Sequence, residues 1–260
     1  MSFSEAGRNL WRKVDGPILS GVLEDAKEPF KEGGFRGIGE HWLKALNARV
    51  EFFQVGAEDL EQSRKKLNEQ AGLIIANHPG WVDVPAVLSA INRDDLLVMT
   101  NERLTEIFKS QLGDKYFVPA TKNPSELRKQ MDNVLAHIKS GGAFLFYPSG
   151  GPSDKFQGTL KHLLGRIEPQ NMVYSFYTNP QDVNNIEKQQ PERLLGLGSQ
   201  VFLARAFNIN KLKDPAVIHA QESYGSAAEW QALLGAGHSD EINRRLASHY
   251  LEKFKDNERG

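Results

Sequence analysis

The sequence has 260 residues, of which 40% are hydrophobic and 25% are charged, so it is long enough for one large domain with an ordinary core. Its formal net charge of −1 predicts no general attraction to nucleic acid or to an anionic membrane. The absence of cysteine excludes disulfides, thiolate metal sites and a cysteine nucleophile.

The N-terminal region, residues 1–47, is predicted to form a helical subdomain. Apolar residues recur at helical spacing, and Gly33-Gly34 marks a turn before a further short helix. This amphipathic region either packs on the following domain or lies at a membrane interface, with Trp11 and Trp42 at headgroup level. We find neither a secretory signal nor a run of the roughly 18 apolar residues that a membrane span needs. We therefore expect a cytoplasmic protein, either free or peripheral at a membrane.

Short apolar runs alternate with helical segments over residues 48–260, which we take as a second domain. The expected strands are 50–55, 72–76, 96–99, 116–118, 143–147, 172–177 and 216–220. The expected helices are 58–70, 84–91, 102–111, 123–139, 226–234 and 240–255. Residues 179–191 are polar enough for a surface loop or a short exposed helix. The alternation predicts an α/β fold with a mixed, mostly parallel central sheet flanked by helices.

The residues that carry chemistry follow the apolar run Gly72–Ala76, where the sequence continues Asn77-His78-Pro79-Gly80-Trp81-Val82-Asp83. In α/β sheets, ligands gather at the carboxyl ends of the strands. A sharp turn at Pro79-Gly80 can bring His78 within hydrogen-bonding distance of Asp83. Asp83 would then hold one imidazole nitrogen, leaving the other free to act as a base.

The pattern Asn-His-x-x-x-x-Asp after an apolar strand resembles the hallmark of the glycerolipid and lysophospholipid acyltransferase family, the PlsC-like enzymes. The family has three further blocks, and this sequence has similar stretches in the same order. Residues 98–122 resemble the second block, residues 146–151 with 155–158 the third, and residues 172–177 the fourth. The resemblance covers about residues 50–180.

The resemblance implies transfer of a fatty acyl chain from acyl-CoA or acyl carrier protein to a hydroxyl acceptor, as in phospholipid biosynthesis. The acceptor would be a lysophospholipid or another polar or amphipathic molecule. His78 would be the general base, and Asp83 would orient it. The acyl donor is a substrate, and neither a cofactor nor a metal is implied.

The chain departs from the family pattern in the third block, where Ser149 stands in place of the family's glutamate and Gly151-Pro152 in place of Thr-Arg. Those family positions help to hold an acceptor phosphate. The candidate acceptor- and oxyanion-binding residues are Ser149, Gly150, Gly151, Lys122 and Lys155. The candidate lining of an acyl-chain groove is Trp81, Val84, Val87 and Leu88.

Two other functions fit the same residues. The dyad could activate water or an amine, which would make the protein a thioesterase or an N-acyltransferase. The departure at Ser149 also fits a non-catalytic acyl- or lipid-binding protein.

Overall fold

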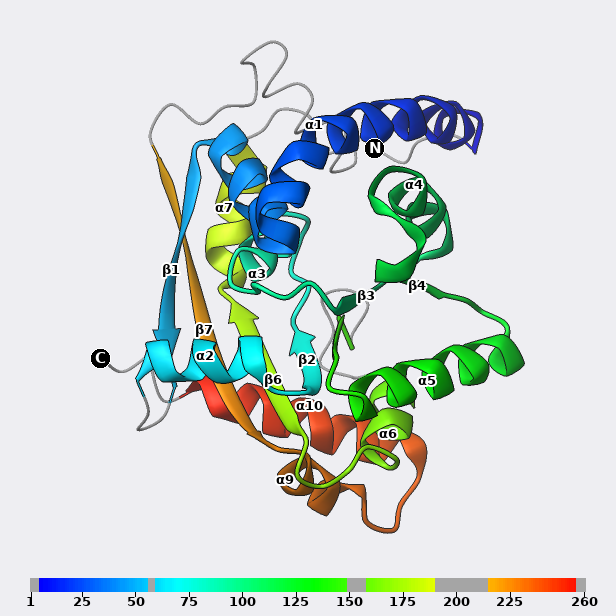
Figure 1. Ribbon diagram of the computed structural model, residues 1–260, viewed down its shortest axis with the longest axis vertical. Coiled ribbons are helices and arrows are strands. Elements are labelled where there is room, and N and C mark those ends of the chain that lie inside the picture. Colours follow the sequence, from blue (N-terminus) through cyan, green and yellow to red (C-terminus); the bar gives the residue numbers. More distant parts are fainter. Residues whose placement is uncertain (1–4, 56–58, 149–157, 190–214, 256–260) are drawn as a thin grey trace.

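The computed structural model describes residues 5–55, 59–148, 158–189 and 215–255, and its centre is a seven-stranded sheet in the order β1-β7-β6-β2-β5-β3-β4 (Figure 1). Within these residues the strands are β1 (Ala48–Gln54), β2 (Gly72–Ala76), β3 (Leu96–Asn101), β4 (Phe117–Ala120), β5 (Ala143–Phe146), β6 (Met172–Thr178) and β7 (Ala216–Ser226). Strands β6, β2, β5, β3 and β4 run parallel, whereas β7 is antiparallel to β6 and parallel to β1. The prediction of a mixed, mostly parallel sheet is confirmed.

Helices cover both faces of this sheet. The helices are α1 (Glu5–Leu46), α2 (Leu60–Glu69), α3 (Asp83–Leu88), α4 (Glu102–Leu112), α5 (Pro124–Lys139), α6 (Gly158–Leu164), α7 (Pro180–Gln189), α9 (Ala227–Gln231) and α10 (Ser239–Lys255), with 3₁₀ turns at Asp114–Tyr116 and Ala232–Leu234. Strand β2 is buried along its whole length. Because side chains alternate across a strand, Ile74 joins the core beneath α1, α3 and α4, while Ile75 joins the core beneath α5, α6 and α10. Strand β2 therefore runs through the middle of the domain.

The long helix α1 bends at a pair of glycines. Gly34 has φ 58 and ψ −145, a backbone conformation that costs glycine little and other residues more. After the bend the helix packs on the domain, where Trp42 is only 2% exposed, while the N-terminal part runs past α4 (Figure 1). Trp42 is thus a core residue, and the side chain of Trp11 lies outside the described part. The domain boundary near residue 47 stays a prediction.

Of the two alternatives for residues 179–191, the short helix is confirmed, since α7 lies in this segment. It is not exposed on every side, because Val183 and Ile186 are 0% and 2% exposed. Ser226 and Glu229 have the spacing of a capping box at the start of the helix expected over 226–234, but the Ser226 side chain makes no capping hydrogen bond. In both places tertiary contacts outweigh the local pattern.

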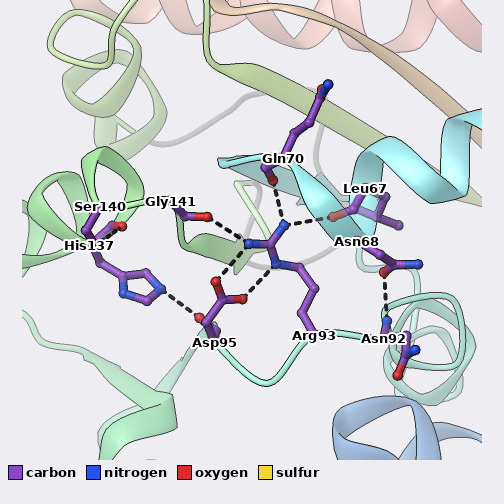
Figure 2. A network of polar contacts seen from close by, with 9 residues as sticks. All are labelled: Leu67, Asn68, Gln70, Asn92, Arg93, Asp95, His137, Ser140 and Gly141. Carbon is purple, nitrogen blue, oxygen red and sulfur yellow. Dashed lines mark hydrogen bonds and ion pairs between the residues drawn. The ribbon is translucent and has the colours of Figure 1, made fainter.

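A buried arginine, Arg93, links the segments that precede β2 and β5, at the edge of the sheet opposite His78 (Figure 2). Its guanidinium donates to the backbone oxygens of Leu67, Gln70 and Gly141 at 3.2, 2.6 and 2.8 Å. It also forms a bidentate ion pair with Asp95, in which Nε lies 2.7 Å from Oδ1 and Nη2 lies 2.8 Å from Oδ2. Two of these carbonyls lie at the end of α2 and one follows α5, so a single cation serves the negative ends of two helices.

Replacing Arg93 with methionine is expected to lower the free energy of unfolding by roughly 3 kcal/mol, because three carbonyls lose their donor and Asp95 loses its partner. The half-exposed Asp95 can turn to water, which limits the cost. Urea unfolding measures this loss as a lower midpoint concentration of urea, with the dependence of the unfolding free energy on urea unchanged. The matched control is Arg128→Met, at an exposed position on α5. Equal stability of the two variants would contradict the assigned role.

Candidate active site

The segment from Asn77 to Asp83 begins where β2 ends, and Asn77 fixes the direction in which the chain leaves the sheet. The Asn77 side chain donates to the backbone oxygen of Thr178 at 2.7 Å and accepts from the Thr178 amide at 2.8 Å. The backbone N–H of Asn77 donates to the Tyr250 hydroxyl at 2.8 Å, and that hydroxyl donates to the backbone oxygen of Phe176. Strand β6 and helix α10 therefore hold the residue that precedes His78.

His78 and Asp83 form the pair that the sequence predicts. Nδ1 of His78 lies 3.0 Å from Oδ2 and 3.1 Å from Oδ1 of Asp83. The Asp83 side chain is fully buried at the start of α3, whereas that of His78 is 33% exposed. A carboxylate on Nδ1 favours the tautomer that carries its proton there, which leaves Nε2 as an acceptor. The arrangement is that of a base oriented from behind by a buried carboxylate.

The electrostatics of the pair follow from burial and proximity. Burial lowers the pKa of His78, but the hydrogen bond to Asp83 and the charges of Asp83 and Glu187 outweigh it, so the net pKa is raised above 6.5. Burial raises the pKa of Asp83 to about 6, against the lowering effects of His78 and of backbone hydrogen bonds at Gly80 and Asp83. At pH 7 Asp83 is thus still ionised and can stabilise an imidazolium.

Tyr147 covers one side of the imidazole. It follows β5, which pairs with β2 in parallel, so both strands end at the same edge of the sheet. The ring centroids of Tyr147 and His78 are 4.9 Å apart. The Tyr147 hydroxyl is buried and has no hydrogen-bonding partner among the described residues, and burial raises its pKa well above 10.0. The start of the predicted third block therefore lies against the His78 ring.

The loop between His78 and Asp83 is fixed from a second side by α7. The Trp81 amide donates to Oε1 of Glu187 at 2.8 Å. Val82 in the same loop is fully buried. The loop is thus held by the contact of His78 with Asp83 at the start of α3 and by the contact of Trp81 with α7.

The sequence model of a protein family described as Acyltransferase matches residues 54–175, which include His78, Asp83 and the strands from β2 to β5. Residues 54–175 belong to the acyltransferase family. Among solved structures, the 1-acyl-sn-glycerophosphate (LPA) acyltransferase PlsC from Thermotoga maritima is similar, with 12% identity, a TM-score of 0.44, and coverage of 92% of this chain and 97% of that chain. No curated protein sequence matches significantly.

The protein is thus an enzyme of the acyltransferase class, and the acyl donor is its substrate rather than a bound cofactor. Within the described ranges, no group of three or more His, Asp or Glu residues could hold a metal ion. Nor does any helix in this part of the acyltransferase have the length and apolarity needed to span a membrane.

Among the other predicted site residues that the structure describes, Lys122, Val87 and Leu88 do not lie on an open surface beside His78. Lys122 is exposed beyond β4, three strands from β2, which is roughly 14 Å at the usual strand spacing. Val87 and Leu88 are 1% and 5% exposed within the core, so neither has free surface to line a groove, whereas Trp81 and Val84 are only partly buried. The remaining candidates, Ser149, Gly150, Gly151 and Lys155, lie outside the described residues.

Three supporting residues of the acyltransferase were missed by sequence reasoning: Thr178, Glu187 and Tyr250. Tyr250 is buried within the helix expected over residues 240–255, and a buried tyrosine needs a partner for its hydroxyl, which is a signal that could have marked it. Thr178 acts through its backbone, and Glu187 stands in a polar stretch, so neither carries a comparable signal.

Proposed function

We propose that this acyltransferase moves a fatty acyl chain from an acyl thioester, on CoA or acyl carrier protein, to a hydroxyl of a lysophospholipid-like or other polar acceptor. The observation that supports this most is the His78–Asp83 pair, in which the carboxylate is buried and the imidazole is partly open to solvent. A hydroxyl can therefore approach the imidazole from outside, while the aspartate stays dry behind it.

In the proposed reaction, Nε2 of His78 accepts the proton of the acceptor hydroxyl as the oxygen attacks the thioester carbonyl. The tetrahedral intermediate carries its negative charge on the former carbonyl oxygen, for which the backbone amides of Gly150 and Gly151 remain candidate donors. Collapse breaks the carbon–sulfur bond, and the leaving thiolate takes the proton from the imidazolium. Asp83 balances the charge on His78 between the two proton transfers.

Hydrolysis is the second candidate, because water reaches a side chain that is 33% exposed. The same pair would then deprotonate water instead of an acceptor hydroxyl, and the protein would release free fatty acid.

Product analysis separates these functions. The full chain is incubated with palmitoyl-CoA or palmitoyl-acyl carrier protein, with and without a panel of lysophospholipids and neutral alcohols, and the products are identified by mass spectrometry. We expect an ester that forms only with an acceptor. Free palmitate at an equal rate without acceptor would favour a thioesterase, and donor binding without turnover would favour a binding protein.

A further inference from the structure

Helix α7 places a carboxylate against the catalytic loop from outside the family-matched region. Glu187 accepts the Trp81 amide at 2.8 Å, and Trp81 lies between His78 and Asp83 in the sequence. The helix itself is anchored, since Val183 and Ile186 are 0% and 2% exposed. The position of the carboxylate is therefore set by packed side chains rather than by a loop.

Gly80 allows this contact. A Cβ at position 80 would lie 2.1 Å from Oε1 of Glu187 and 2.7 Å from Cγ1 of Val183. Both distances are shorter than real Cβ contacts, so a side chain at position 80 would have to displace the Glu187 carboxylate and shift Val183. The Glu187 carboxylate therefore lies close to both the Trp81 amide and Gly80.

The charges around His78 come from few groups in the described part of the chain. Asp83 on α3 and Glu187 on α7 are the carboxylates that act on it. Tyr147 after β5 and Tyr250 on α10 act on Asp83, and burial raises the pKa of both phenols well above 10.0, so both are neutral near pH 7. Glu187 is therefore the second negative charge that favours the protonated imidazole.

We infer that Glu187 is a positioning residue of this enzyme, which holds the loop between His78 and Asp83 in its working shape. The inference rests on the proposed role of His78 as the base. Glu187 does not touch the reacting atoms. It acts through the Trp81 amide and through its charge.

Two substitutions separate the two effects. Glu187→Gln keeps an oxygen that accepts the Trp81 amide but removes the charge, so the acid limb of kcat/KM should move to lower pH while the plateau changes by less than about threefold. Glu187→Ala also leaves the amide without a partner, so plateau kcat should fall about tenfold or more with little change in KM for the donor. A purely structural role would leave the pH profile of the glutamine variant where it is.

Two measurements need no turnover, so they decide the inference even if the proposed function fails. The NMR titration of the His78 ring proton should show a lower pKa in Glu187→Gln than in the wild type. Hydrogen exchange of the Trp81 amide should be faster in Glu187→Ala, and in Gly80→Ala, where the new methyl group displaces the carboxylate.

The matched control is Asp182→Asn, which removes the same charge from the same helix but at a residue bound to His219. It should leave the His78 titration and the Trp81 exchange rate unchanged. The inference is overturned if His78 titrates alike in Glu187→Gln and the wild type, or if Glu187→Ala keeps wild-type Trp81 exchange.

Discussion

Replacing His78 with alanine is expected to lower acceptor-dependent acyl transfer by about 10²- to 10⁴-fold, the usual contribution of a general base. Nε2 of His78 is the atom that the proposed reaction uses, because Nδ1 is bound to Asp83. The loss should appear in kcat and in kcat/KM alike, since the proton transfer occurs in the transition state. Steady-state thiol release with saturating acceptor measures it.

The alanine variant also leaves the buried Asp83 without its imidazole partner, which costs stability until the carboxyl takes up a proton. His78→Gln is the companion variant, because its amide can still donate to Asp83 but cannot act as a base. His238→Ala, at an exposed position before α10, serves as the control and should keep full activity. A folded His78→Gln protein with wild-type rates would refute the assignment of the base.

Replacing Asp83 with asparagine should lower kcat by about 10²- to 10⁴-fold with little change in KM. The asparagine has the size of the aspartate but carries no charge to stabilise the imidazolium, and it can hold the ring in the wrong tautomer. The same thiol-release assay measures the effect, and Asp114→Asn at an exposed position is the control. Full activity in Asp83→Asn would show that the buried carboxylate is not part of the mechanism.

The same variant has a characteristic dependence of stability on pH. The folded pKa of Asp83 is about 6 and its ordinary value is 3.8, so the folded state holds more protons than the unfolded state between these values. The contribution of Asp83 to stability therefore falls as pH rises from about 4 to about 6. Asparagine does not titrate, so the stability of Asp83→Asn does not fall in this way. Between pH 4 and pH 6 its free energy of unfolding should therefore rise by about 1–3 kcal/mol relative to that of the wild type. Denaturant unfolding at pH 4 and pH 6.5 would show it, and a constant difference would contradict the raised pKa.

Much of the fold followed from the sequence because strands and helices here carry strong local signals. The run Gly72–Ala76 is apolar without interruption, and it is indeed the fully buried strand β2. The helix expected over residues 123–139 opens with Asn123-Pro124, a typical cap and first helical residue, and α5 begins at Pro124 with Asn123 accepting the Ser125 amide. The His78–Asp83 contact was predicted because it is local, spanning one turn between a strand and a helix.

The rest of the site depends on contacts between distant segments, which no local pattern specifies. Glu187 meets the Trp81 amide across 106 positions, and Tyr250 meets Asn77 across 173. Val87 and Leu88 were expected to line a groove because they are apolar and close to His78, but α1 packs over them. An apolar helix face looks the same in the sequence whether a ligand or another helix covers it.

The most direct test of the account is thiol release from palmitoyl-CoA by the wild type and by His78→Gln, each with and without the acceptor that gives an ester product. The account predicts release that needs both the acceptor and His78, with the variant reduced by about 10²-fold or more. Acceptor-dependent release that survives in the folded variant at the wild-type rate would contradict it.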